Sequence, residues 1–139
     1  MAHIHTIKIR GFHCDLYQHV NNARYLEFLE EARWEYVAEV PDLAKMGDHG
    51  LGFIIAAINI EYKRPVGLGD VVEIRSQMVD FAAKRAVMQQ QVFNLGNGKL
   101  VADARVSFAV IDLATGRAVP MAGEVRSWFE PKDASGDPA

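Results

Sequence analysis

The residues best suited to chemistry lie in one short segment, where Asp15 is followed by His19 and then by Asn22. A carboxylate such as Asp15 can act as a general base towards water or attack a carbonyl carbon directly. Asn22 stands where a helical pattern begins, and the first N–H groups of a helix are unpaired donors that can stabilise developing negative charge. We therefore expect Asp15 to promote attack and the backbone N–H of Asn22 to stabilise an oxyanion.

Each of these residues also has a purely structural alternative. Asp15 can cap a turn, and Asn21 or Asn22 can cap the helix. His19 can share proton handling with Asp15, or it can hydrogen-bond the backbone. Cys14, the only cysteine, is expected to pack rather than react. From these residues alone the structural roles are the commoner ones, so both alternatives stay open at this point, with Asp15, Asn22 and His19 as the catalytic candidates.

The element that must position these groups is predicted over residues 22–40, with Pro41 ending it. Apolar residues recur there at helical spacing and glutamates occupy another face, which indicates an amphipathic helix of about five turns. Glu30 and Arg33 have the spacing of an intrahelical pair. The apolar positions are Leu26, Leu29, Ala32, Tyr36, Val37 and Val40, and the glutamates are Glu27, Glu31, Glu35 and Glu39.

The rest of the chain is rich in predicted strands joined by tight turns. A first strand over residues 7–10 precedes the helix, and a loop with room for a short helical turn follows it over 42–52. Residues 122–129 fit a short strand or helix. This order predicts an α+β domain over residues 1–130 and a flexible polar tail over 131–139. The later strands are expected at 53–62, 71–81, 85–95 and 100–113.

Composition excludes several classes of function. The net charge of -3 gives no general attraction for phosphate backbones, and we find no local basic stripe, so no nucleic-acid partner is expected. The longest apolar run, residues 53–58, is far shorter than the roughly 20 residues that span a bilayer, so no membrane insertion is expected. A single cysteine suits a reducing compartment, and the start of the chain lacks a signal-peptide pattern. We expect a cytoplasmic location.

Three runs of sequence carry a family resemblance that covers residues 4 to about 126. They are DLYQHVNNARY from Asp15, the EEAR that ends at Arg33, and INIEYKRP over residues 58–65. The chain resembles the 4-hydroxybenzoyl-CoA thioesterase branch of the hotdog superfamily, and within it the bacterial long-chain acyl-CoA thioesterases associated with fatty-acid degradation. The resemblance implies a hotdog fold, in which an antiparallel sheet wraps around one long central helix.

The resemblance also implies a reaction, the hydrolysis of medium- to long-chain fatty acyl-CoA to free acid and coenzyme A. Asp15 would be catalytic and the Asn22 N–H would bind the thioester carbonyl, with no metal and no cofactor. Cations near the rim would hold the coenzyme A phosphates, although solvated charges are common at strand ends and in turns. The predicted substrate-binding residues are Asn21, Tyr25, Lys63, Arg64, Lys84 and Arg85. Leu26, Leu29, Phe53 and Ile54 could line an acyl channel, which core packing explains equally well.

Several alternatives stay open. The substrate could be carried by acyl carrier protein, or it could be an aryl-CoA, although the family's glycines after the aspartate are absent here. A hotdog hydratase acting on 2-enoyl thioesters would need an Asp-x-Asn-Pro-x-His arrangement, which this chain lacks. A non-catalytic acyl-CoA sensor would need a partner or a DNA-binding element. Because a short sheet around one helix leaves edges to be covered, we expect a homodimer or homotetramer with the site between subunits.

Overall fold

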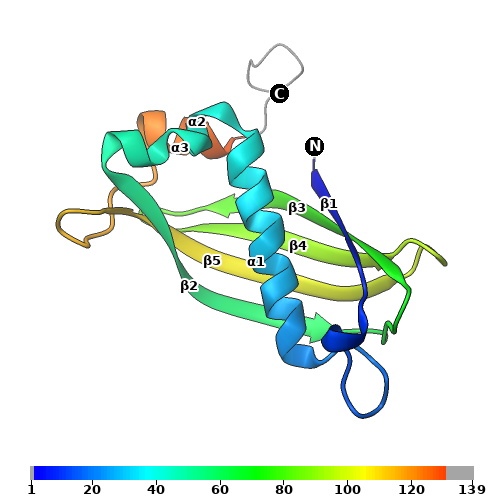
Figure 1. Ribbon diagram of the computed structural model, residues 1–139. Coiled ribbons are helices and arrows are strands. Elements are labelled where there is room, and N and C mark those ends of the chain that lie inside the picture. Colours follow the sequence, from blue (N-terminus) through cyan, green and yellow to red (C-terminus); the bar gives the residue numbers. More distant parts are fainter. Residues whose placement is uncertain (1, 131–139) are drawn as a thin grey trace.

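A five-stranded antiparallel sheet and one long helix organise the chain, for which a computed structural model describes residues 2–130 (Figure 1). The strand order is β1-β3-β4-β5-β2, so β1 and β2 are the two edges. This is the α+β arrangement that the sequence predicts. The strands are β1 (His3–Lys8), β2 (Leu51–Tyr62), β3 (Val71–Phe81), β4 (Ala86–Asn94) and β5 (Leu100–Asp112).

The long helix α1 (Asn22–Glu39) lies across one face of the sheet (Figure 1). Its start is the predicted one, and Pro41 follows its end. The buried stripe shares only Leu29 and Ala32 with the predicted positions, because Leu26 is 40% exposed and Tyr25, Phe28 and Arg33 are buried instead. Tyr36, Val37 and Val40 are partly buried. The stripe then follows the i, i+3, i+4, i+7 spacing of a helix packed on one side. Its buried residues are Tyr25, Phe28, Leu29, Ala32 and Arg33.

The first strand is longer and begins earlier than predicted, at His3 rather than at residue 7. Its inward-facing residues are His3, His5 and Ile7. Because two of these three are histidines, the sequence does not show the apolar alternation by which a strand is recognised. Both histidines contact α1: His3 Nε2 lies 2.6 Å from a Glu39 carboxylate oxygen and His5 Nε2 lies 2.5 Å from one of Glu31. These pairs attach the edge strand β1 to the helix.

The connection between α1 and β2 is more ordered than the predicted loop over residues 42–52. It contains α2 (Pro41–Ala44) and the 3-10 helix η2 (Met46–His49), and β2 begins at Leu51. Leu43 and Met46 are buried, and burying these side chains fixes the segment. A second 3-10 helix, η1 (Gly11–His13), follows β1.

The segment near the end of the described chain is helical, which decides between the two predicted alternatives. It forms α3 (Gly123–Phe129), whose Trp128 and Phe129 are buried. In Figure 1 it stands with α2 at the end of the molecule opposite the start of α1. The predicted tail over 131–139 lies outside the described residues. No helix within residues 2–130 has the length and apolar character to cross a membrane.

A buried polar network holds the middle of α1 to the sheet. The Arg33 guanidinium donates to Gln90 Oε1 at 3.0 Å, and the Gln90 amide donates to Ser76 Oγ and to the Leu29 carbonyl, each at 3.0 Å. Burial lowers the pKa of Arg33, and nearby Glu30 opposes that shift. The predicted Glu30–Arg33 pair is therefore wrong, because the arginine turns inward to a glutamine on β4.

Candidate active site

The segment that carries Asp15 forms a tight hairpin. Cys14 and Val20 pair as an antiparallel bridge, the Asp15 N–H donates to the His19 carbonyl at 2.8 Å, and the Gln18 N–H donates to the Asp15 carbonyl at 2.9 Å. Gln18 closes the turn in the left-handed region, with a φ of 62°. The Tyr17 N–H donates to Asp15 Oδ1 at 2.9 Å, so the carboxylate is held by its own loop.

The hairpin is anchored to the segment that links β2 to β3. The Val20 N–H donates to the Val66 carbonyl at 2.9 Å, and His19 pairs with Gly67. A Cβ on Gly67 would lie 3.1 Å from the Gln18 carbonyl oxygen, so glycine permits this close approach. Val20 and Val66 are both buried. Asp15 is therefore fixed against the body of the protein although its loop is exposed.

The start of α1 lies directly beyond the hairpin. Asn21 is the N-cap, and its side-chain oxygen accepts the Ala23 N–H at 2.8 Å. Asn22 is then the first helical residue, and its carbonyl accepts the Tyr62 hydroxyl at 3.0 Å. Within residues 2–130, no acceptor is found for the Asn22 N–H. That N–H is a free donor at the positive end of the helix.

Asp15 and Asn22 share a cavity of about 330 Å³. Its size falls in the usual range of small-molecule sites, about 300–1,000 Å³. The walls come from the hairpin, the first turn of α1 and the end of β2, three parts of the chain that the anchoring contacts bring together. The cavity is lined by Asp15, Tyr17, His19, Val20, Asn22, Tyr25, Tyr62, Lys63, Arg64 and Pro65.

Two tyrosines that line this cavity lie against each other. The rings of Tyr25 and Tyr62 lie edge to face with centroids 5.3 Å apart. Burial raises the pKa of Tyr25 to about 12, with smaller contributions from Tyr62 and Cys14. Tyr25 therefore keeps its proton at neutral pH, because its hydroxyl is even less acidic than an ordinary tyrosine.

The four predicted cations separate into two groups. Lys63 and Arg64 line the cavity. A hydrogen bond from Lys63 Nζ to Glu61 raises the pKa of the lysine, and the Arg64 guanidinium donates to the Leu100 carbonyl at 2.8 Å. Lys84 and Arg85 lie in the β3–β4 hairpin. The Asp15 loop lies near the start of β3, so the length of this strand, about 33 Å, separates the hairpin from it within one chain.

The sequence therefore anticipated most of the cavity but not all of it. The structure brings Asp15, His19, Asn22, Tyr25, Lys63 and Arg64 together, whereas the Asn21 side chain is used as the helix cap. Sequence reasoning missed Tyr17, Val20, Tyr62 and Pro65 as lining residues. Tyr62 had a signal, because it lies in the INIEYKRP run, directly before the two cations.

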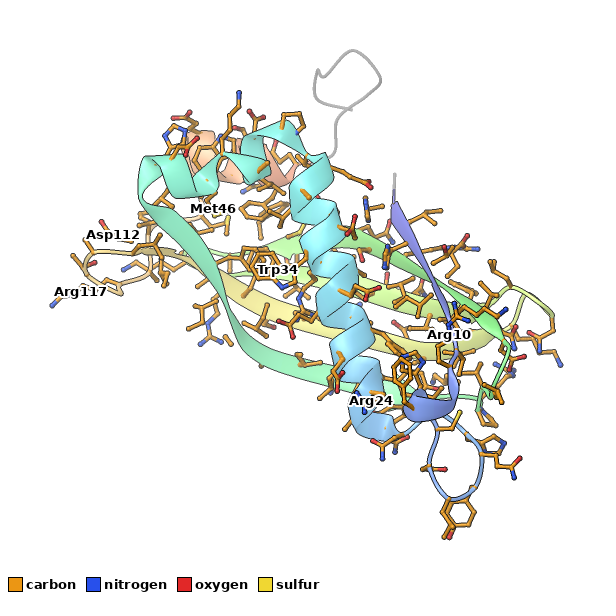
Figure 2. The ribbon with its side chains drawn as sticks, viewed as in Figure 1. Arg10, Arg24, Trp34, Met46, Asp112 and Arg117 are labelled. Atoms are coloured by element: carbon orange, nitrogen blue, oxygen red, sulfur yellow. The ribbon has the colours of Figure 1, made fainter. Side chains whose placement is uncertain are left out.

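A second, smaller cavity of about 200 Å³ lies between α1 and β2. Phe53 and Ile54 line it, as does Trp34, which projects from the side of α1 that faces β2 (Figure 2). Two of the four predicted channel residues thus meet here. Leu29 belongs instead to the core, where it is fully buried, and Leu26 lines neither cavity. Glu30, Arg33 and Ile55 complete the lining.

The arrangement suits attack on a polarised carbonyl group. A carboxylate on a fixed loop can activate water, and a free N–H at a helix N-terminus can receive the oxyanion that forms. Both groups open into the same cavity, which has cations at one side.

The comparisons with known proteins agree with this chemistry. Residues 11–129 match the family described as the Thioesterase-like superfamily. The chain is 44% identical over 124 residues to the long-chain acyl-CoA thioesterase FadM of Escherichia coli strain K12, covering 89% of this chain and 94% of that protein.

Solved structures share the fold. The probable thioesterase YbaW from Escherichia coli superposes with a TM-score of 0.86 at 43% identity, covering 90% of this chain and 94% of that one. A Thermus thermophilus thioesterase, solved in complex with coenzyme A and Zn, gives a TM-score of 0.77 at 27% identity over 91% of this chain and 90% of that one. The predicted hotdog fold is confirmed, and the chain belongs to the thioesterase-like superfamily.

Proposed function

We propose that this protein hydrolyses acyl-coenzyme A thioesters to a free acid and coenzyme A. The observation that carries the proposal is the shared cavity, in which the Asp15 carboxylate and the N-terminus of α1 meet. The 44% identity with an enzyme named as a long-chain acyl-CoA thioesterase supports the same reaction.

The chemistry divides between the two groups. Asp15 takes a proton from water as the water oxygen bonds to the thioester carbon, and the carbonyl oxygen becomes an oxyanion held by the Asn22 N–H. Collapse of this intermediate re-forms the carbonyl and breaks the carbon–sulfur bond. Asp15 returns its proton to the departing sulfur, so coenzyme A leaves as the thiol. His19 lines the same cavity and is a second candidate for moving this proton.

Lys63 and Arg64 support coenzyme A as the carrier. They lie at the cavity as cations, and phosphate groups form strong charge-assisted hydrogen bonds with such side chains. The Thermus thermophilus thioesterase, which was solved in complex with coenzyme A, also supports this choice. Lys84 and Arg85 stay a separate prediction, because one chain alone does not bring them to the cavity.

The acyl part is proposed to be a medium- to long-chain fatty group. The second cavity between α1 and β2 supports this, since its walls include the apolar side chains of Trp34, Phe53 and Ile54. Leu26, which is 40% exposed, lies along α1 between Tyr25, which lines the first cavity, and Glu30, which lines the second. An aryl-CoA or a substrate on acyl carrier protein is the competing proposal.

We further propose a homodimer or homotetramer in the cytoplasm. The edge strand β2 runs for 12 residues and carries Ile54, which is 53% exposed, so a second copy could cover it. The cytoplasmic location rests on the single cysteine, which suits a reducing compartment.

The test is a substrate panel with purified protein. Free-thiol release is measured from acyl-CoAs of graded chain length, from an aryl-CoA and from acylated acyl carrier protein. We expect the highest kcat/KM on medium- to long-chain acyl-CoA. A preference for the aryl-CoA or for the carrier protein would replace the proposed substrate. Tight acyl-CoA binding without any thiol release would make the protein a sensor, and water addition to a 2-enoyl-CoA would make it a hydratase.

A further inference from the structure

The Tyr25 side chain is almost entirely buried, yet its hydroxyl has no hydrogen-bond partner within residues 2–130. The residue is 3% exposed, and it lines the cavity that holds Asp15. Buried tyrosine hydroxyls usually find a partner, because burying an unpaired polar group is costly. The unpaired hydroxyl is therefore available to a molecule that binds in the cavity.

The hydroxyl is accessible from the cavity and not sealed in the core. Among residues 2–130, only His3 Nδ1 is a buried side-chain atom that lacks both solvent contact and a partner. The Tyr25 hydroxyl oxygen therefore keeps contact with solvent, and Tyr25 reaches solvent at the wall of the cavity. The ring itself is fixed by edge contacts with Phe28 at 6.0 Å and with Tyr62 at 5.3 Å.

Helix geometry directs this side chain towards the oxyanion donor. Tyr25 lies three residues after Asn22, which places both on one side of the first turn of α1. Side chains in a helix lean towards its N-terminus and cover the preceding turn. By this rule the Tyr25 side chain covers the first turn of α1, which carries the free N–H of Asn22.

The other tyrosines of the cavity are less suited to donate to a ligand. The Tyr62 hydroxyl already donates to the Asn22 carbonyl at 3.0 Å. Tyr17 is 77% exposed on the outer hairpin. Of the three, Tyr25 is the one that is buried and whose hydroxyl donates to no described residue. Its pKa of about 12 keeps the hydroxyl protonated, so it can act as a donor.

We propose that the Tyr25 hydroxyl is a catalytic residue that donates a hydrogen bond to the thioester carbonyl oxygen, beside the Asn22 N–H. This rests on the proposed thioester hydrolysis. As water attacks, the carbonyl π electrons move to the oxygen, and two donors then share the negative charge. The tyrosine keeps its proton throughout, so the step needs no further acid or base.

The test compares Tyr25→Phe with Tyr36→Phe, the same change at a partly buried tyrosine of α1 that does not line the cavity. Because the Tyr25 hydroxyl bonds no described residue, phenylalanine should fold normally, which circular dichroism and thermal unfolding check. We expect Tyr25→Phe to lower kcat at least about tenfold with KM little changed, in line with the loss of one oxyanion donor. Tyr36→Phe should keep the activity of the parent protein.

A second substrate separates hydrogen bonding from structural damage. In an acyl dithioester of coenzyme A the carbonyl oxygen is replaced by sulfur, a weak acceptor. The Tyr25→Phe defect should shrink on the dithioester. Equal defects on both substrates, or a kcat loss smaller than tenfold on the thioester, would overturn the role of Tyr25. Activity that survives in Asp15→Asn would instead overturn the proposed function, so the two failures are distinguishable.

Discussion

Asp15 combines a fixed position with an available oxygen. Its Oδ1 atom accepts the Tyr17 N–H, and no hydrogen bond from residues 2–130 reaches Oδ2. The loop contact orients the carboxylate, and the second oxygen is left for water in the cavity. The turn-capping role and the catalytic role therefore coexist in one side chain.

Asp15→Asn should keep this fold, because the asparagine oxygen can still accept the Tyr17 N–H. The general base is lost, so kcat on acyl-CoA should fall at least about a hundredfold. The matched control is Asp112→Asn, because Asp112 Oδ1 likewise accepts a backbone N–H of its own turn, that of Ala114. Asp112 lies far from Arg24 and the start of α1 (Figure 2). Comparable activity of the two folded variants would remove Asp15 from the mechanism.

His13, which lies close to Asp15 in the sequence, should make the free energy of unfolding depend on pH. Burial and the nearby Arg24 lower its pKa below the ordinary 6.5, and its Nδ1 accepts the Arg10 N–H at 2.9 Å. The unfolded chain therefore binds this proton more readily, and stability should fall as pH drops from about 6.5 through the lower folded pKa. Above that window the residue is neutral in both states.

His13→Asn retains an acceptor for the Arg10 N–H but cannot titrate. Urea unfolding at about pH 7.5 and about pH 5 should therefore show a smaller acid-induced loss of unfolding free energy in the variant than in the parent protein. If both proteins lose the same stability, His13 is not a source of the acid sensitivity. His49→Asn serves as the comparison at the η2 end of the chain.

At the scale of elements, the start of α1 is held from three sides. Asn21 caps it, the hairpin precedes it, and the Tyr62 hydroxyl on β2 holds the Asn22 carbonyl. Further along, Arg33 ties the helix to Gln90 on β4. The free N–H therefore has a defined place relative to Asp15 although it belongs to a different element.

Asn22→Pro tests this N–H directly. Proline is well tolerated as the first helical residue, and the preceding Asn21 already has φ -61° and ψ 136°, a conformation that suits a residue before proline. We expect a kcat loss of about 10²- to 10³-fold, because an oxyanion donor is removed. Asn22→Ala keeps the N–H and should be mild. Equal turnover of the two folded variants would move the donor elsewhere in residues 18–25.

At the scale of the whole molecule, the two sheet edges are unequal. β1 has six residues, with its inward histidines paired to α1, whereas β2 has 12 residues and exposes Ile54. A long apolar edge invites pairing with another strand. The proposed assembly should therefore depend on β2.

Ile54→Lys should weaken self-association, because a charge on this edge would have to be buried when a second copy covers it. Val79→Lys is the control: Val79 is 40% exposed but lies on β3, inside the sheet. Sedimentation of the parent protein should show an oligomer that Ile54→Lys shifts towards monomer. A monomeric parent protein, or an unchanged Ile54→Lys oligomer, would contradict assembly through this edge.

The sequence by itself determined the parts whose physics is local. Asp15, the cap at Asn21 and the first helical residue Asn22 lie within a few positions of one another, so turn and cap chemistry fixes their neighbourhood. The strands β3, β4 and β5 were also predictable within one or two residues, because turn residues separate their long runs.

Only the tertiary structure decided what depends on register across the sheet. Lys63–Arg64 and Lys84–Arg85 look alike in the sequence, yet the first pair lines the cavity and the second lies at the other end of β3. Tyr25 and Tyr62 are in contact although they lie 37 positions apart in the sequence (62 minus 25). Arg33 pairs with Gln90 for the same reason. These contacts arise from strand order and helix packing, which no local pattern in the chain encodes.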